Sequence, residues 1–193
     1  MVKKKEFTKV KKKSWVDVLA PRAFQSQSIG ESYVSAASNL LHRQVKANLM
    51  TLTRDIKKQN INAQFEVSEI KENKAFTRTI GFTLLPSAIR RLVRRRKNKI
   101  SNSFVIKSKD NVSFRIKTLV ITQFRVSRAI ATALRKVALD IFTEHASKTD
   151  FENFFGDVFS TKLQREIKDN LKKIVPIKIV EVTYVKEIKP KKQ

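Results

Sequence analysis

The chain has 193 residues and carries 42 Lys or Arg against 17 Asp or Glu, which gives a formal net charge of +25 at neutral pH. Because 41% of the residues are apolar, the chain can bury one sizeable core, and a single domain is the starting expectation. The absence of cysteine excludes thiolate metal sites, thiol nucleophiles and disulfides, and it fits an intracellular, reducing compartment. No apolar run approaches the roughly 20 residues that span a bilayer, which disfavours membrane insertion.

The chain begins with a lysine-rich segment. Residues 1–13 contain seven Lys and one Glu without apolar periodicity, so we expect a flexible basic arm there. The extended pattern of residues 15–20, ended by Pro21, predicts a short strand. Gly30 then predicts a turn before a second strand near Tyr33.

Alternating apolar residues predict the first hairpin. Apolar and polar residues alternate over residues 45–53, which lead into a polar turn. Residues 63–67 and 75–85 are then predicted to pair as two strands joined by a turn at 71–74. Gly81 inside the second strand predicts a bulge or a sharp bend.

A second hairpin and a final strand follow. Residues 103–107 and 112–121 flank Asp110 and Asn111, which tolerate the positive φ angles of a tight turn. Residues 177–185 predict the last strand, because Pro176 ends the helix before it.

Three helices are predicted between these strands. Ser127 begins one with an apolar stripe at helical spacing, formed by Ile130, Leu134, Val137, Ala138, Ile141 and Phe142. Thr149 and Glu152 have the spacing of a capping box for a short helix that ends near Gly156. The last helix covers residues 161–174.

Consecutive hairpins followed by grouped helices predict an α+β fold with a largely antiparallel, barrel-like β-sheet and several packed helices. We expect residues 1–13 to be the basic arm, residues 14–188 to form a single α+β domain, and residues 189–193 to be a basic tail.

The positive charge is concentrated in the middle of the chain. Residues 73–139 contain seventeen Lys or Arg and a single acid, Asp110. Pro86 ends the preceding strand, and Ser87 is placed to cap a helix that carries the Arg-rich run 90–99. Apolar residues at helical spacing in this run would fix the arginines on the core, and fixed arginines can grip adjacent phosphates in bidentate fashion.

No catalytic or metal-binding set can be assembled. His42 and His145 lie in different segments without metal-ligand spacing. Glu66, Glu69 and Glu72 are explained as the polar face and turn of one strand. We therefore expect no enzyme activity, no cofactor and no metal.

Aromatic residues give little sign of base recognition. Most phenylalanines lie on apolar faces, and only Phe24 and Phe124, each near basic residues, are candidates for stacking on bases. Recognition of the RNA backbone and shape is the better match.

Four segments resemble the archaeal and eukaryotic small-subunit ribosomal protein family S-three-Ae (eS-one). They are residues 13–21 (KSWVDVLAP), residues 75–78 (AFTR) leading to Gly81, residues 89–96 (IRRLVRRR) and residues 173–177 (KIVPI). The resemblance covers residues 12–188. Asp110 and Asn111 stand where the family commonly has Asp-Gly, which questions the turn type but not the hairpin.

The resemblance implies a structural constituent of the small ribosomal subunit, in the cytoplasm, that binds rRNA through phosphate contacts on the platform. The site would lie near the 3′ end of the rRNA and the mRNA exit, with the universal platform protein S-eleven as a neighbour and mRNA as a further contact. The predicted RNA-binding residues are Lys11, Lys12, Lys13, Arg22, Arg90, Arg91, Arg94, Arg95, Arg96, Lys97, Lys99, Arg125 and Arg128.

One alternative uses the same basic surface. A cationic adaptor could bind acidic membranes or acidic protein partners. Against a membrane role, the helix expected after Pro86 lacks the large Trp, Phe and Leu face of interfacial helices.

Overall fold

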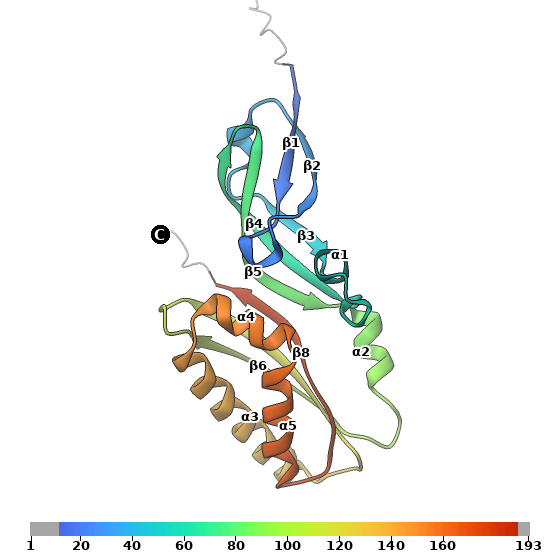
Figure 1. The fold of residues 1–193 in the computed structure, drawn as a ribbon. Coiled ribbons are helices and arrows are strands. Elements are labelled where there is room, and N and C mark those ends of the chain that lie inside the picture. The colour runs from blue at the N-terminus through green and yellow to red at the C-terminus, as the bar shows by residue number, and fades with distance from the viewer. Residues whose placement is uncertain (1–11, 189–193) are drawn as a thin grey trace, which may run out of the picture. The chain divides into compact units, whose positions relative to one another are not determined.

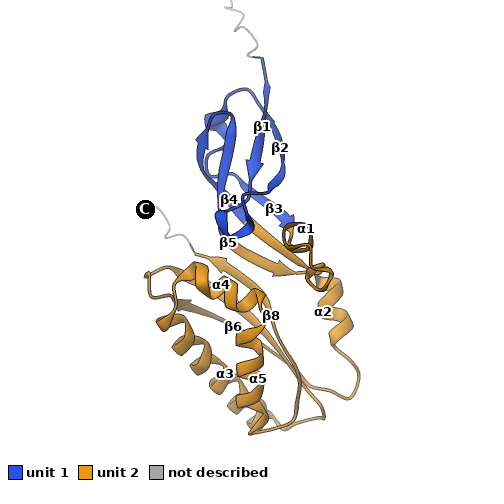
Figure 2. Ribbon diagram, in the orientation of Figure 1, with its two compact units in different colours: residues 1–47, 65–79 blue, residues 48–64, 80–193 orange. Residues whose placement is uncertain are grey.

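The computed structural model describes residues 12–188, and the chain divides into two compact units (Figure 2). Unit 1 comprises residues 1–47 and 65–79, and unit 2 comprises residues 48–64 and 80–193. Strands β4 (Ile61–Lys71) and β5 (Lys74–Leu84) contribute to both units. Figure 1 shows the elements in chain order.

Every predicted strand is present. The other strands are β1 (Ser14–Leu19), β2 (Ser28–Val34), β3 (Gln44–Asn48), β6 (Lys99–Lys107), β7 (Ser113–Thr122) and β8 (Ile177–Glu187). The α-helices are α1 (Leu49–Thr53), α2 (Pro86–Leu92), α3 (Arg128–Lys148), α4 (Phe151–Phe159) and α5 (Lys162–Lys172). Short 3₁₀ helices cover Arg22–Phe24, Ala37–Leu40 and Ile56–Lys58. The strand expected over residues 45–53 ends early, because the Asn48 side chain accepts a hydrogen bond from the Met50 amide and caps α1.

Hydrogen bonds order the strands as β2-β1-β5-β8-β7-β6, with β4 paired to both β3 and β5. The pair β1–β5 is parallel, whereas β1–β2, β5–β8, β6–β7 and β7–β8 are antiparallel. The predicted α+β class with a largely antiparallel sheet and packed helices is confirmed. The sheet is open, however: within residues 12–188 no ladder joins β2 to β6, and a barrel requires its edge strands to pair.

Unit 1 is stabilised by a small aliphatic core. Its buried members are Val16, Val18, Val34, Leu40, Val67 and Ala75. The β4–β5 hairpin is closed by Glu72 and Asn73, whose φ angles of 47° and 64° suit a two-residue turn. Asn73 also donates a hydrogen bond from its side-chain amide to the Trp15 carbonyl at 2.6 Å, which ties this turn to β1.

Glu66 departs from its predicted place on the polar face of a strand, because its side chain is only 1% exposed. Its Oε1 lies 3.3 Å from His42 Nδ1, and its Oε2 accepts a hydrogen bond from Arg78 Nη2 at 3.1 Å. A carboxylate removed from water requires such partners. The pairing explains why an acid is accommodated inside unit 1 and gives Glu66 a structural role.

We expect Arg78→Met to lower the free energy of unfolding of unit 1 by about 2 kcal/mol, because it removes a guanidinium charge from beside a buried carboxylate. Urea unfolding followed by the fluorescence of Trp15, the only tryptophan, reports on this unit. The matched control is Arg115→Met on the exposed face of β7. Equal losses for the two variants would contradict a specific role of the Glu66 pair.

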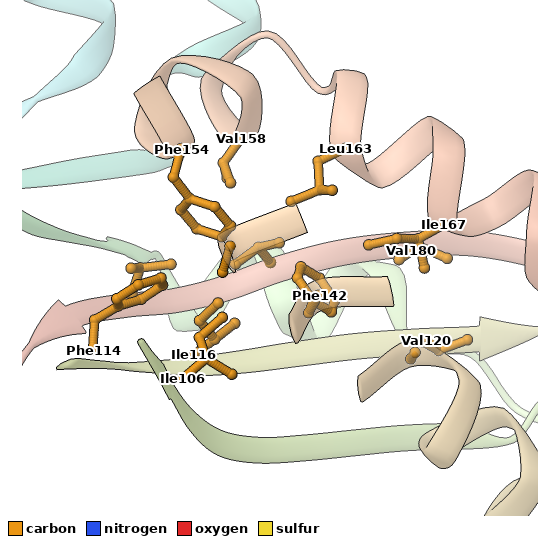
Figure 3. Packing of buried hydrophobic residues seen from close by; sticks show 14 of the residues in the cluster. Ile106, Phe114, Ile116, Val120, Phe142, Phe154, Val158, Leu163, Ile167 and Val180 are labelled. Atoms are coloured by element: carbon orange, nitrogen blue, oxygen red, sulfur yellow. The ribbon is translucent and has the colours of Figure 1, made fainter. Parts of the chain in front are cut away.

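Unit 2 has the larger core, formed where α3, α4 and α5 cover one face of the sheet (Figure 3). Phe114 of β7, Phe142 of α3 and Phe154 of α4 are fully buried in it, and the ring centres of Phe114 and Phe154 lie 5.1 Å apart. The predicted stripe of α3 is confirmed, since all six of its residues belong to this core or pack against it. Phenylalanines in unit 2 therefore serve mainly in packing.

The ends of the helices match the predictions only in part. Ser127 caps α3, with its Oγ accepting from the Ile130 amide at 3.4 Å. The predicted capping box at Thr149 is wrong, because Asp150 occupies the cap position of α4 and the Thr149 hydroxyl donates to the His145 carbonyl instead. Gly156 lies inside α4 and does not end it.

Asp110, the single acid of the basic stretch, has a structural role in the predicted second hairpin. Asn111 adopts a φ of 58°, as expected for the turn. The Asp110 carboxylate accepts a hydrogen bond from the Phe151 amide at 3.2 Å. It thereby joins the β6–β7 connection to the start of α4.

Gly81 permits a close backbone approach. It lies opposite Lys186 in the β5–β8 ladder, and a Cβ at this position would stand 2.3 Å from the Val185 carbonyl oxygen. The glycine that we predicted to mark a bulge or a bend is therefore required by the contact between two strands of unit 2.

Candidate nucleic-acid interface

The Arg-rich run divides into a helix end and a turn. Pro86 occupies the first position of α2 after the cap residue Leu85, so the prediction of a Ser87 cap is wrong. The helix ends at Leu92, because Val93 adopts an extended conformation with ψ 121°. Arg90 and Arg91 thus lie on the last turn of α2, whereas Arg94, Arg95, Arg96 and Lys97 lie in the loop before β6.

Asn98 fixes the end of this loop to β7. Its backbone amide donates to Thr122 Oγ1 at 3.2 Å, and its carbonyl accepts from the Thr122 amide at 3.2 Å. Its side-chain amide donates to the Val126 carbonyl at 3.0 Å. Since Thr122 is fully buried, these hydrogen bonds fix the end of the loop to the core of unit 2.

Lys97 lies beside a second lysine from a distant strand. Lys178 belongs to β8, next to Ile179, which pairs with Ile121 of β7. The pKa of Lys178 is lowered from its ordinary value of 10.5, first by hydrogen bonding and charge repulsion from Lys97, and further by desolvation and by the charge of Arg94. Arg94, Lys97 and Lys178 therefore form a cluster of like charges, called here the cationic cluster.

A groove of about 530 Å³ adjoins this cluster. One wall contains Lys97 and Lys99, and the other contains Arg128 and Arg135 of α3. Ser127 and Thr132 add hydroxyl groups, and no acid is among the lining residues. The N-terminus of α3 also favours anions through its unpaired amides and dipole. Such a groove can bind phosphate groups.

The structure brings together only some of the predicted RNA-binding residues. Lys97, Lys99 and Arg128 line the groove, and Arg94 lies at Lys178. Arg90, Arg95, Arg96 and Arg125 are exposed outside it. Arg91 Nη2 donates to Asn60 Oδ1 at 2.7 Å and lines a different cavity.

The remaining predicted residues belong to unit 1. Lys12, Lys13 and Arg22 are exposed there, and the Lys13 ammonium lies 5.6 Å from the centre of the Tyr33 ring. Lys11 lies outside the described residues.

Two cations of the site were missed. Arg135 follows Arg128 by seven residues, which places both on one face of α3, so helical spacing could have identified it. Lys178 gave no local signal, because only the register of β8 brings it to Lys97.

The exposed aromatic residues also differ from the expectation. Trp15 and Tyr33, 59% and 52% exposed, pair across β1 and β2 with ring centres 4.8 Å apart. Phe124 is 66% exposed, as a stacking candidate requires. Phe24 instead packs edge-on against Phe65 at 5.8 Å.

Other chemistry is limited in the part of the chain that the structure describes. Over residues 12–188, no three His, Cys, Asp or Glu side chains gather closely enough to hold a metal ion. His145 Nε2 lies 3.5 Å from Asp157 Oδ2, a local pairing between α3 and α4. No helix among these residues combines the length and the apolar content needed to cross a bilayer.

Comparison with known proteins agrees with the resemblance noted in the sequence. The model of the Ribosomal S3Ae family matches residues 1–191. A "Small ribosomal subunit protein eS1" of Sulfurisphaera tokodaii is 33% identical over 181 residues, covering 94% of both chains. Proteins of the same name from Saccharolobus solfataricus and Saccharolobus islandicus are 30% and 29% identical, covering 94% of this chain and 87% of theirs. The chain therefore belongs to the Ribosomal S3Ae family.

Proposed function

We propose that this chain is a structural protein of the small ribosomal subunit and that it binds rRNA phosphates in the groove beside the cationic cluster. The relatives that bear the name of a small-subunit protein support the first part. As a member of a ribosomal protein family the chain is a component of the translation machinery in the cytoplasm and, as predicted, not an enzyme.

The observation that carries the phosphate site is the groove itself, which Lys97, Lys99, Arg128 and Arg135 line without any acid. The Lys97 and Lys178 ammonium groups repel each other, and an anion between them would relieve this repulsion. Arg94 adds a further positive charge at Lys178, and Lys99, Arg128 and Arg135 extend the positive surface along the groove.

We also propose where on the small ribosomal subunit this chain lies. The family resemblance supports a position on the platform near the 3′ end of the rRNA and the mRNA exit, with the universal protein S-eleven as a neighbour. We propose further that the other predicted residues, Lys11, Lys12, Lys13, Arg22, Arg90, Arg91, Arg95, Arg96 and Arg125, contact the RNA backbone outside the groove. Residues 14–188 would be the RNA-binding part of the chain.

Salt dependence tests the proposal. If about eight phosphates are neutralised, the logarithm of the affinity for small-subunit rRNA should fall against the logarithm of salt concentration with a slope of about −6 to −7. Filter binding of the full chain to an rRNA fragment across a salt series measures this slope. A slope near zero would contradict phosphate recognition.

A further inference from the structure

A second cavity of unit 2, about 560 Å³, shares no lining residue with the groove. Leu84, Ala88, Leu92 and Phe159 give it an apolar side, formed by β5, α2 and α4. Glu181 of β8 lies on its wall. A cavity of this size and mixed polarity is typical of sites for small ligands or single nucleotides.

Glu181 supplies acceptor capacity that the chain itself leaves unused. Over residues 12–188, no donor forms a hydrogen bond or an ion pair with its carboxylate, and desolvation by burial raises its pKa above the ordinary 4.5. The other acid of the lining, Asp55, already accepts from the Lys57 amide at 3.0 Å and pairs with Lys58 at 3.9 Å. A ligand in the cavity therefore meets one available carboxylate.

We expect Glu181→Gln to raise the thermal midpoint of the chain near neutral pH. Burial opposes ionisation, so the carboxylate costs stability once the pH exceeds the unfolded-state pKa near 4.5, and the full cost is reached above the raised folded-state pKa. Below 4.5 the two proteins should melt alike. Thermal unfolding followed by circular dichroism across this range measures the difference, and a lower midpoint of the variant near neutral pH would contradict it.

Cations of the same lining favour a phosphate group. Arg91 uses one nitrogen on Asn60 and keeps further N–H donors, and Arg165 of α5 lines the cavity as well. Lys57 and Lys58 bring the lining to four cations against two acids. The cavity thus combines a positive surface with a single carboxylate acceptor and an apolar wall.

We propose that this cavity binds one unpaired guanosine of an RNA, an inference that rests on the proposed RNA-binding function. Glu181 accepts hydrogen bonds from the base, and Arg91 and Arg165 bind its phosphate. The Watson–Crick edge of guanine carries two adjacent donors, N1–H and the 2-amino group, which match the two oxygens of a carboxylate. Adenine and cytosine each present an amino donor beside an unprotonated acceptor nitrogen, and uracil presents one N–H between two carbonyls. A basic peptide would face four lining cations, so a nucleotide is favoured.

An unpaired nucleotide is required because a base in a helix uses this edge for pairing. Proteins that read RNA bases use loops and bulges, where extrusion costs least. The expected target is therefore a bulged or loop guanosine next to an RNA helix.

Two RNA hairpins that differ in one bulged nucleotide, guanosine or adenosine, test the inference with the full chain. Fluorescence anisotropy at fixed salt should show about tenfold tighter binding of the guanosine hairpin, the order expected for one bidentate base contact. Glu181→Gln should reduce this preference to less than about twofold and leave the affinity for the adenosine hairpin unchanged. The control Glu144→Gln, on the exposed face of α3, should keep it.

The outcomes separate this inference from the proposed function. If both hairpins bind with strong salt dependence but equal affinity, the guanosine site is overturned and phosphate recognition stands. If the preference survives in Glu181→Gln, the assignment of Glu181 is overturned. If neither hairpin binds, RNA binding fails and the guanosine site with it.

Discussion

The triple variant Arg94→Ala, Lys97→Ala and Lys178→Ala should bind small-subunit rRNA on the order of a hundredfold more weakly than the natural chain at moderate salt. Each lost phosphate contact means that fewer counterions are released when the RNA binds. The slope of the logarithm of affinity against the logarithm of salt concentration should therefore become shallower by about 2 to 3. The affinity should fall for many RNA sequences alike, because the contacts are to the backbone. Filter binding to the same rRNA fragment across a salt series measures both quantities.

A matched variant removes the same charge elsewhere. Lys148, Lys172 and Lys173 are exposed on or beside α3 and α5, in the part of the sequence from Asp140 onward, where eleven basic residues stand against nine acidic ones. Their replacement with alanine should change the affinity several-fold at most. A loss equal to that of the triple variant would contradict a localised site and leave only net charge as the cause. The triple variant should remain folded, since removing Lys178 also removes its repulsion by Lys97.

Gly81→Ala should lower the free energy of unfolding of unit 2 by about 2–4 kcal/mol. The new Cβ would stand 2.3 Å from the Val185 carbonyl oxygen, and this neighbour is backbone and not the end of a flexible side chain. Relief of the overlap requires β5 and β8 to separate at Gly81 and Lys186, which breaks hydrogen bonds in the ladder. Urea unfolding followed by far-ultraviolet circular dichroism measures the loss.

Gly156→Ala is the control in the same unit. A Cβ at Gly156 meets nothing within 4 Å, and the residue lies inside α4. This substitution should stabilise the helix by up to about 1 kcal/mol, because alanine has the higher helix propensity. A Gly81→Ala variant as stable as the natural chain would contradict the close approach of the two strands.

Local periodicity predicted the elements that form by local rules. The alternation in β4 and β5 and the stripe on α3 identify their buried faces, and Ser127 identifies the start of α3. The helix predicted to carry the whole run 90–99 ends at Leu92 instead. The hydrogen bonds from Asn98 to Thr122 and Val126 fix the end of a loop that takes up the rest of the run. Those partners lie more than twenty residues away in the sequence, so propensity could not reveal them.

The candidate site was predictable as a charge pattern but not as a geometry. The sequence identified Lys97, Lys99 and Arg128 as basic residues, whereas their arrangement around one groove depends on the β6–β7 register and the start of α3. Lys178 joins them only through the pairing of β8 with β7. Glu66 was placed on a polar face because sequence alone does not reveal its pairing with Arg78 across β4 and β5.

A structure of the small ribosomal subunit containing this chain would show directly whether the cationic cluster binds rRNA phosphates. We expect rRNA phosphate oxygens within about 3 Å of the Lys97 and Lys178 ammonium groups and of the Arg94 guanidinium. If these groups face water or another polypeptide, with no polynucleotide in reach, the phosphate site is contradicted.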